Sequence, residues 1–440
     1  MKMKKVLTLA AAFTMAFSIT ACGGGGNTAS PETPAPAPAP AETAKTDPPP
    51  ADAPEFAPEE GAKLVVWESK DERAYTDEVI KAFTEKYGVE VTLEEMAPTD
   101  QLTKLSQDGP SGLAADVVIF PHDQLGRAAS SNLVAPNDVF EVETIQANTE
   151  SAIQGVTYND TLYGYPRAAE TYLMYYNKEL IQEAPKSFEE VIEFSEGFTD
   201  NAKNKYGVMW ETGNLYFTYP FLASNGGYIF GNNGTDVKDI GLNNEGAVKS
   251  MEVYQSLNKV LPVKAGDITP DIKRSLFTAG DLAIDINGPW ELSAYKEALG
   301  DNLGVAPIPT IAGQPAVSLA GIKAWYVNAY TDYPKAARLF ANFATNEENQ
   351  LKLSSLVGSV PTNKAAQESD QIKNDPYVSA FTEQFNSSVP MPSVPQMNNV
   401  WSPVGAALTE IWDNNKDIKA SLDNAVKQLQ ELNSGTGEAK

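Results

Sequence analysis

Leu64-Val65-Val66-Trp67 is the stretch that indicates the fold, because a short continuous apolar run is typical of a strand buried on both faces. Apolar side chains then recur at helical spacing as far as Tyr87, and Gly88 suits the left-handed residue that ends a helix. Residues 89–93 and 116–120 predict two further strands. This order of strand, helix and strand predicts βαβ units and a parallel sheet.

The alternation of strand and helix continues along the chain. Ser187, with Glu190 three residues later, forms a capping box for a helix that we expect to run through Phe198. Asn243 can cap another helix through Leu261. Strands are predicted over residues 172–176, 282–286 and 324–328, and amphipathic helices over 333–345 and 418–432. The predicted fold class is therefore α/β.

Composition excludes several kinds of function. The 440 residues carry 33 Lys and Arg against 58 Asp and Glu, a formal net charge of -25. No dense basic stripe is left for phosphates, so we expect no nucleic-acid partner. The apolar fraction of 42% supports a large core, and the length suggests about two or three domains. One Cys and one His exclude an internal disulfide and a Cys/His zinc site, and we expect no metal and no cofactor.

The first residues predict export. Lysines at positions 2, 4 and 5 precede an apolar run over 6–17, which indicates a signal peptide over residues 1–21. The run is too short for a bilayer, which requires about 20 residues. Ile19-Thr20-Ala21-Cys22-Gly23 resembles the lipobox of bacterial lipoproteins, which implies that Cys22 becomes the first mature residue and carries lipid. The alternative is an ordinary signal peptide that happens to precede a free Cys.

Residues 22–61 are rich in Pro, Ala and Gly. This composition lacks large apolar side chains and favours extended, semi-rigid conformations, so we predict a disordered stalk that holds a domain away from the membrane. The alternative is a Pro-rich ligand for a partner domain, but aromatic or basic specificity residues do not accompany the prolines.

Catalytic motifs are mostly missing. The nearest approach to a phosphate loop, residues 241–250, has two extra residues before its Lys, so we interpret it as a helix start. A zincin motif is impossible with one His, and Cys22 lacks a separate His base. His122 follows a predicted strand and the chain has no nucleophile elbow, so we interpret His122 as a structural residue. Paired carboxylates for glycoside hydrolysis stay open, because 58 acidic residues offer many pairs.

Three aromatic residues, Tyr216, Trp290 and Trp401, follow turns rich in Gly, Pro or Asn, which usually face solvent or a cleft. A flat ring matches the apolar C–H face of a pyranose, and covering roughly 50 to 100 Å² there stabilises by about 1 to 2.5 kcal/mol per ring. The tryptophans inside apolar runs or on a predicted helix are instead expected in the core; these are Trp67, Trp325 and Trp412.

Sugar hydroxyls also need hydrogen-bond acceptors. Asp71, Glu72, Asp123 and Glu170 lie at or near predicted strand ends, where ligands bind in open α/β sheets. A hydrogen bond to a charged group contributes about 1.5 to 3 kcal/mol. The alternative for each carboxylate is a solvated loop residue or a helix cap. Rings and carboxylates together predict a site for a neutral sugar.

From Lys63 to about Leu432 the sequence resembles the extracellular solute-binding proteins of carbohydrate ABC importers, and specifically the maltose/maltodextrin-binding proteins. The matching segments follow the family's order: Lys63-Leu64-Val65-Val66-Trp67, Pro121-His122-Asp123, Tyr163-Gly164-Tyr165-Pro166 through Glu170 to Tyr176-Asn177-Lys178, Tyr216-Phe217-Thr218-Tyr219-Pro220, Gly226-Gly227-Tyr228, Ile286-Asn287-Gly288-Pro289-Trp290, Gly313-Gln314-Pro315 and Met391-Pro392-Ser393-Val394-Pro395-Gln396-Met397.

The resemblance implies a two-lobed, periplasmic-binding-protein-like (type II) fold with sugar bound between the lobes. It implies an N-terminal lobe of residues 62–169 and 322–373, a C-terminal lobe of residues 170–317 and 376–435, and hinge crossings at 318–321 and 374–375. The candidate sugar-binding residues are Asp71, Glu72, Phe120, Asp123, Glu170, Tyr216, Trp290 and Trp401. Among them the family implies stacking by the last three and hydroxyl binding by Asp71, Asp123 and Glu170, and it often has Trp where Phe120 stands.

The sequence departs from the best-known members at charged positions of the site. Gln124 stands where they have Arg, Asn214-Leu215 where they have Glu-Pro, Ser402 where they have Tyr, and Gly405 where they have Arg. These changes remove charged hydrogen-bond partners, so they bear on which sugar is bound.

We therefore expect a substrate-binding lipoprotein of a carbohydrate ABC importer, which captures maltose/maltodextrin-type oligosaccharides by lobe closure and delivers them to the transmembrane subunits of the permease. We expect a monomer without enzymatic activity, lipid-anchored to the cell membrane and facing outside. One alternative is a binding protein for another oligosaccharide, such as a cyclodextrin or a galacto-oligosaccharide. Another is a secreted glycosidase.

Overall fold

The computed structural model describes residues 56–435. The predicted signal peptide over 1–21, the lipidation site Cys22 and the predicted stalk up to residue 55 lie outside the described residues and stay predictions. The last part of that stalk, residues 56–61, belongs to the folded unit instead. Phe56 contacts Phe140 edge to face with 5.5 Å between ring centroids, and Glu59 accepts hydrogen bonds from the backbone of Lys335 and Ala336. The predicted stalk therefore ends too late, because a ring and a carboxylate at its end find partners on the domain.

Within the described residues the larger sheet has seven strands, in the order β12-β6-β11-β3-β1-β2 with β13 paired to β11. β1 is parallel to β2 and β3, as predicted, but β11 is antiparallel to β3 and β6, so the sheet is mixed. The strands are β1 (Lys63–Glu68), β2 (Glu90–Glu95), β3 (Val117–Pro121), β6 (Tyr165–Glu170), β11 (Ser318–Val327), β12 (Val360–Pro361) and β13 (Ser388–Pro390).

A second sheet among residues 56–435 has four strands in the order β10-β7-β9-β8. β8 is parallel to β9, whereas β7 is antiparallel to both β9 and β10. The strands are β7 (Leu173–Asn177), β8 (Tyr206–Met209), β9 (Leu282–Asn287) and β10 (Leu303–Ala306), and a small hairpin joins β4 (Thr157–Tyr158) to β5 (Thr161–Leu162).

Each sheet has its own hydrophobic core, and these cores divide residues 56–435 into two lobes. In the first lobe, successive residues of β3 point to opposite faces, so that Ile119 lies in one core cluster and Val118 and Phe120 in another. In the second lobe, one large cluster surrounds β7 and β9. The apolar strands are therefore covered on both sides, as their sequences predict.

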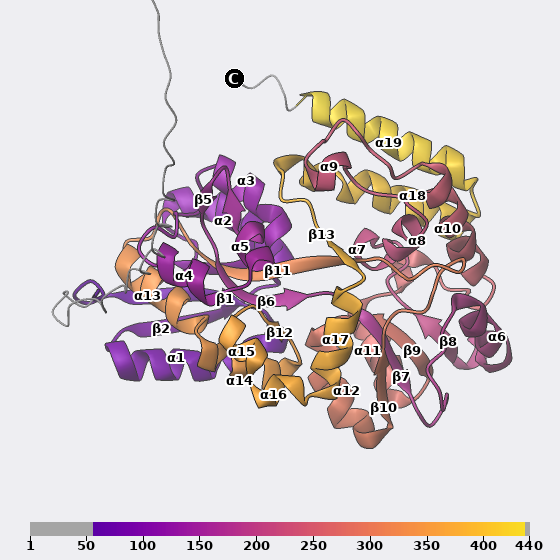
Figure 1. Cartoon of the computed structure of the whole chain (residues 1–440), viewed down its shortest axis with the longest axis horizontal. Coiled ribbons are helices and arrows are strands. Elements are labelled where there is room, and N and C mark those ends of the chain that lie inside the picture. Colours follow the sequence, from indigo (N-terminus) through magenta and orange to yellow (C-terminus); the bar gives the residue numbers. More distant parts are fainter. Residues whose placement is uncertain (1–55, 436–440) are drawn as a thin grey trace, which may run out of the picture. The chain divides into compact units, whose positions relative to one another are not determined.

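β11 passes from one lobe into the other, as Figure 1 shows. Its residue Leu319 lies in the core of the second lobe, whereas Ala324 lies in the core of the first. The chain also changes lobe between Ala169 and Tyr172. Links of this kind are where a hinge can act, although the boundaries 318–321 and 374–375 stay predictions.

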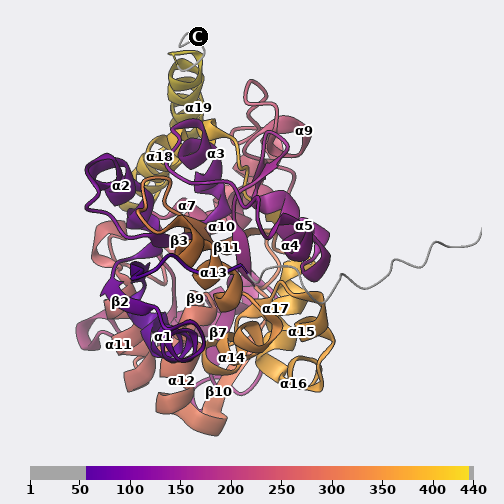
Figure 2. The same cartoon turned by 90° about the vertical axis from the view of Figure 1, so that its left-hand side faces the viewer.

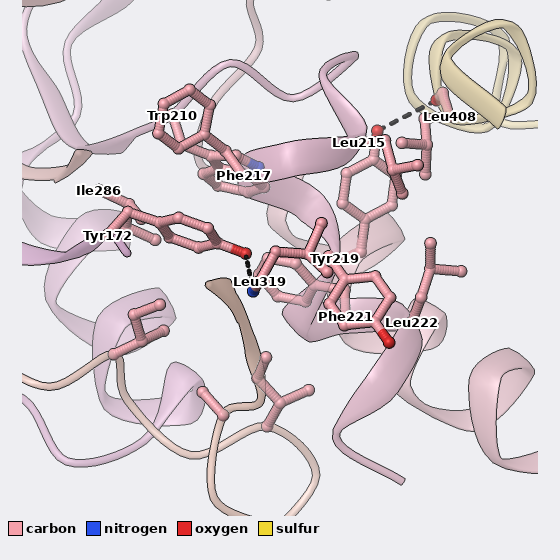
Figure 3. Close-up of a cluster of buried hydrophobic side chains, with 14 of the residues drawn as sticks. Tyr172, Trp210, Leu215, Phe217, Tyr219, Phe221, Leu222, Ile286, Leu319 and Leu408 are labelled. Atoms are coloured by element: carbon pink, nitrogen blue, oxygen red, sulfur yellow. Dashed lines mark hydrogen bonds between the residues drawn. The ribbon is translucent and has the colours of Figure 1, made fainter. Parts of the chain in front are cut away.

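The second core is rich in aromatic side chains. Figure 3 shows Tyr172 beside Phe217, with 5.3 Å between ring centroids, and the Tyr172 Oη accepts a hydrogen bond of 3.2 Å from the backbone N–H of Leu319. This bond ties the start of β11 to the second lobe. Trp67, Trp325 and Trp412 are each at most 2% exposed, which confirms the prediction that they are core residues.

Helices cover both sheets, and α18 lies side by side with α19 (Figures 1 and 2). In the first lobe they are α1 (Arg73–Tyr87), α2 (Pro98–Asp108), α3 (Leu125–Ser130), α4 (Glu141–Ala147), α5 (Glu150–Gly155), α13 (Pro334–Ala344), α14 (Glu347–Val357), α15 (Lys364–Glu368) and α16 (Asp370–Lys373). In the second lobe they are α6 (Phe188–Phe198), α7 (Leu215–Thr218), α8 (Pro220–Ala223), α9 (Gly231–Gly234), α10 (Glu245–Leu257), α11 (Pro270–Ala279), α12 (Leu292–Leu299), α17 (Pro376–Phe385), α18 (Trp401–Asn414) and α19 (Ile418–Gly435).

Two helix starts illustrate what local sequence determines. Ser187 caps α6 and accepts a hydrogen bond from the Glu190 backbone, as predicted. The cap of α10 is Asn244 rather than Asn243, because the Asn243 side chain donates to Asp423 of α19 instead. A tertiary contact thus decides between two adjacent asparagines.

Candidate functional site

Asp123 and Trp401 bring the two lobes together. Asp123 lies in the 3-10 turn η3 (His122–Gln124) directly after β3, and Trp401 opens α18 after the turn η8 (Pro395–Asn399). Asp123 is 5% exposed, and burial raises its pKa to about 7 even though the side chain of Trp401 donates a hydrogen bond to it. A buried carboxylate of one lobe therefore meets the indole N–H of the other.

Tyr216 belongs to the same place. Asn214 caps α7 and holds the backbone N–H of Tyr216 at 3.0 Å, which fixes the start of this short helix. Burial raises the pKa of Tyr216 well above its ordinary value, and the negative charges of Glu170 and Asp123 raise that pKa further. The phenol oxygen therefore lies within electrostatic range of both carboxylates.

Trp290 continues this surface by way of Phe217. Tyr216 contacts Phe217 at 5.2 Å between ring centroids, and Phe217 contacts Trp290 at 6.3 Å. The Trp290 indole N–H donates to Asn287, and the ring lies so close to Gly288 that a Cβ there would be 2.1 Å from it. We call Tyr216, Phe217 and Trp290 the aromatic row; Tyr216 and Trp290 are half-buried.

Asp71 lies at a second contact between the lobes. It is partly exposed in the turn η1 (Lys70–Glu72) and accepts a hydrogen bond of 3.1 Å from Arg274 of α11. Arg274 also binds both carboxylate oxygens of Glu291, at 2.6 and 2.8 Å, in the turn η6 (Pro289–Glu291) that carries Trp290. Asp71 thus lies near the aromatic row while it forms an ion pair.

Glu72 and Glu170 are buried beneath these groups. Glu72 contacts Arg167 and Lys323, and Lys323 also lies 3.5 Å from Glu170. Burial alone would raise the pKa of Glu72, but the two cations outweigh burial and lower it. Glu170 is 9% exposed and its pKa is raised, chiefly by burial. Glu170 therefore adjoins the aromatic row, whereas Glu72 is enclosed by cations.

Phe120 is the candidate whose side chain lies entirely within a hydrophobic core. Its side chain is fully buried, and its ring stacks on Tyr326 with 4.0 Å between centroids and 5° between planes. That Phe120 stacks on a sugar stays a prediction, and the burial of its ring argues against it. The physical reason is the continuity of the apolar run, since Phe120 points into the core like Val118.

Sequence reasoning missed several charged residues on or beside the strands. Arg167 and Lys323 are almost fully buried, on β6 and β11, and Lys273 of α11 pairs with Asp285 of β9 at 3.1 Å. A charged residue inside an apolar stretch is the signal that could have found them, because such residues are rarely buried unless paired. Their partners are far away in sequence: Lys323 and Glu72 are separated by 251 positions.

His122 joins the two lobes without taking part in the aromatic row. Its Nδ1 accepts a hydrogen bond from the backbone N–H of Ile322, so Nε2 carries the proton and donates to the Met391 carbonyl at 2.9 Å. Burial lowers its pKa to about 4, so the ring is neutral. These contacts confirm the structural interpretation of His122.

A cavity of about 210 Å³ lies beside His122, between Gly155 and the segment 390–394. None of the predicted sugar-binding residues lines it. Asp123 and Glu170 are buried in this structure, whereas Tyr216 and Trp290 are half-buried.

Residues 56–435 include no cluster of three or more His, Cys, Asp or Glu placed to hold a metal ion. Over the same part of the chain no helix combines the length and the apolar character needed to cross a bilayer.

A two-lobed α/β unit, with aromatic and acidic groups from both lobes meeting between them, has the organisation of a solute-binding protein. The family model of bacterial extracellular solute-binding proteins matches residues 78–380. The chain therefore belongs to the bacterial extracellular solute-binding protein family.

Individual relatives match over most of their length. The chain is 33% identical to a galactooligosaccharide-binding protein of Bacillus subtilis (strain 168), over 83% of this chain and 88% of the relative. It is 32% identical to a maltooligosaccharide ABC transporter solute-binding lipoprotein of Streptococcus pneumoniae (strain ATCC BAA-255 / R6), over 88% of this chain and 92% of the relative.

Solved structures agree with this assignment. MalX from Streptococcus pneumoniae in complex with maltopentaose has a TM-score of 0.78 at 31% identity, over 84% of this chain and 100% of the other. A cyclo/maltodextrin-binding protein complexed with maltotetraose has a TM-score of 0.70 at 35% identity, over 86% of this chain and 98% of the other. The two-lobed type II fold expected from sequence is thereby confirmed.

Proposed function

We propose that this protein is the extracellular sugar-binding component of a carbohydrate ABC importer, and that it captures maltose/maltodextrin-type oligosaccharides between its lobes. The observation that carries the proposal is the meeting of the aromatic row with Glu170 and Asp123, next to Trp401. Rings offer apolar faces to pyranose C–H groups, and carboxylates accept hydrogen bonds from hydroxyls. Relatives that bind maltooligosaccharides support the choice of ligand.

Lobe movement supplies the mechanism. Asp123 and Glu170 are too buried to receive an oligosaccharide without an opening of the lobes. Ligand then shifts the population toward the closed form only by its greater affinity for that form. An affinity in the micromolar range corresponds to about -8 kcal/mol, which stacking and a few charged hydrogen bonds can supply after ordering costs.

The proposal extends to location and partners. The leader 1–21 directs export, lipid on Cys22 tethers the protein to the membrane with the lobes facing outside, and the stalk gives them reach. The closed, loaded form is what the transmembrane subunits of the permease receive. The protein acts as a monomer and catalyses no reaction on the sugar. A relative that is a lipoprotein supports the tether.

Calorimetric titration of the purified soluble part, residues 56–440, against maltose, maltotetraose, a cyclodextrin and a galacto-oligosaccharide tests the ligand. We expect the tightest binding for a malto-oligosaccharide. The 33% identical galactooligosaccharide-binding relative makes galacto-oligosaccharide the second candidate, and preference for it would replace the maltodextrin assignment.

The glycosidase alternative needs a separate measurement. Maltotetraose incubated with the protein is analysed by chromatography for shorter products. We expect binding with the sugar intact, and protein-dependent hydrolysis that survives further purification would overturn the receptor proposal.

A further inference from the structure

A cluster of buried charges lies directly beneath the proposed sugar site. We call Glu68, Glu72, Arg167, Glu170 and Lys323 the buried charge cluster. Each is 9% exposed or less. Arg167 pairs with Glu68 at 2.5 Å and with Glu72, and Lys323 lies 2.8 Å from Glu72 and 3.5 Å from Glu170. The cluster therefore links β1, η1, β6 and β11.

The charges in this cluster do not balance. Its three carboxylates face two cations, and Glu68 and Glu72 hold the close contacts with Arg167. Glu170 has only the longer contact with Lys323, and its Oε1 accepts no hydrogen bond from any described residue. A buried carboxylate without donors is costly, and hydroxyl groups of a ligand are a source of donors. Glu170 is thus the unsatisfied end of the cluster.

The groups that face Glu170 come from several elements. Lys323 of β11 attracts its charge, Glu72 of η1 repels it, and Arg167 of β6 attracts it less strongly than Lys323 does. Tyr216 of α7 lies on the side of the aromatic row, together with Asp123 of η3. Burial raises the pKa of Glu170, and Lys323 is the main force that lowers it.

We propose that Lys323 is a positioning residue for ligand binding, which holds the Glu170 carboxylate charged and oriented so that it accepts hydrogen bonds from a neutral polyol. The inference rests on the proposed function of the site. Lys323 touches no ligand; it acts through Glu170. Lys323 pairs in β11 with Pro121 of β3 and Ala168 of β6, which keeps its ammonium fixed relative to Glu170 at the end of β6.

The sign of the pH effect follows. Ionised Glu170 accepts from hydroxyls and protonated Glu170 does so less strongly, so affinity falls as pH falls through the pKa of Glu170. When the Lys323 charge is removed, burial and the Glu72 charge raise the pKa of Glu170 further, because the attraction of Lys323 no longer lowers it. The loss of affinity then occurs at a higher pH.

Affinity for maltotetraose is measured by calorimetry from about pH 5 to about pH 8.5 for the wild type, Lys323→Met and Lys323→Arg. We expect Lys323→Met to move the midpoint upward by about one pH unit or more, with about tenfold weaker binding at neutral pH that recovers in part at high pH. Lys323→Arg keeps the charge and restores the wild-type midpoint. An unchanged midpoint in Lys323→Met overturns the proposal.

A readout without sugar separates this inference from the proposed function. The ¹³C carboxyl signal of Glu170, identified by its loss in Glu170→Gln, is titrated in ligand-free wild type and Lys323→Met. An upward shift of its midpoint supports the coupling even if maltotetraose fails to bind, and equal midpoints overturn it even if the sugar binds well. Should Lys323→Met not fold, as judged by near-UV circular dichroism, Lys323→Gln removes the charge while keeping a hydrogen bond to Glu72.

Discussion

Trp290 is held in place by its own turn although it is only half-buried. Its indole covers Gly288, and its N–H is satisfied by Asn287. The local turn therefore holds the ring in place whether or not a ligand stacks on it. An oriented ring loses little conformational entropy on binding, so most of the area that it buries contributes to affinity.

Trp290→Ala should weaken binding of maltotetraose about tenfold or more, because it removes roughly 50 to 100 Å² of stacking area. The protein should remain folded, since the side chain is only half-buried. Calorimetry measures the affinity, and Tyr330→Ala, which truncates an exposed ring beside Gly109, is the control. Unchanged affinity would remove Trp290 from the site.

Asp123 makes stability depend on pH. Its pKa is about 7 in the folded protein against an ordinary 3.8, so the folded form holds the proton more tightly than the unfolded chain. Its contribution to stability is therefore fully present below about pH 4 and is lost as pH rises to about 7. Relative to Asp123→Asn, the wild type should lose on the order of 3 kcal/mol between these limits. Urea denaturation at several pH values measures this, and equal pH dependence in both proteins would contradict it.

Local sequence predicts the candidate site residues by type but not by environment. Tyr216, Trp290, Asp123 and Glu170 follow turns or end strands, and such positions can be recognised from local sequence. Local sequence does not reveal whether a side chain is buried or paired, because burial and pairing depend on distant segments. The sequence predicts that Glu72 accepts hydrogen bonds from a sugar, with a solvated loop residue as the alternative, yet cations from two distant strands enclose it.

The turns η1 and η6 form a contact between elements of different lobes, joined by Arg274. The two carboxylates that Arg274 binds at this contact differ in burial. Asp71 is partly exposed, so its pairing with Arg274 adds little to stability, whereas Glu291 is 1% exposed and depends on Arg274 for both oxygens.

Arg274→Ala should therefore destabilise the protein by about 3 kcal/mol, because it leaves a buried carboxylate unpaired. Asp71→Asn should change the free energy of unfolding by less than about 1 kcal/mol. Urea unfolding of both variants at neutral pH checks the difference. Comparable small effects would mean that Glu291 finds another partner when Arg274 is lost.

Elements were predicted best where local sequence decides them. The strand at 282–286 and the helix through Phe198 correspond closely to β9 and α6. β11 was expected only over 324–328 but begins at Ser318, because pairing with β6 and β13 extends it through Gly321 and Lys323. Such pairing joins segments that are distant in sequence, so the local periodicity of apolar residues does not reveal it.

At the scale of the whole molecule, the two lobes also meet where α3 approaches η8. A Cβ added to Gly126 would lie 2.3 Å from the Ser393 carbonyl oxygen and 2.9 Å from Pro395. Leu125 belongs to the first core and Met397 to the second, so this approach occurs only when the lobes are together.

Gly126→Ala should keep the lobes apart and weaken binding of maltotetraose by about tenfold or more. Small-angle X-ray scattering with saturating sugar should then give a larger radius of gyration than for the wild type. Gly197→Ala is the matched control, because a Cβ at Gly197 meets nothing within 4 Å. Wild-type affinity in Gly126→Ala would show that binding does not need this approach.

The attachment of Phe56 and Glu59 to Phe140 and to the start of α13 has a mechanical consequence. Any force applied through the amino-terminal segment enters the first lobe alone. If that segment is held at a surface, the first lobe stays in place while the second lobe moves as the lobes open and close. A docking partner then meets the first lobe at a fixed distance from the surface and the second lobe at a variable one.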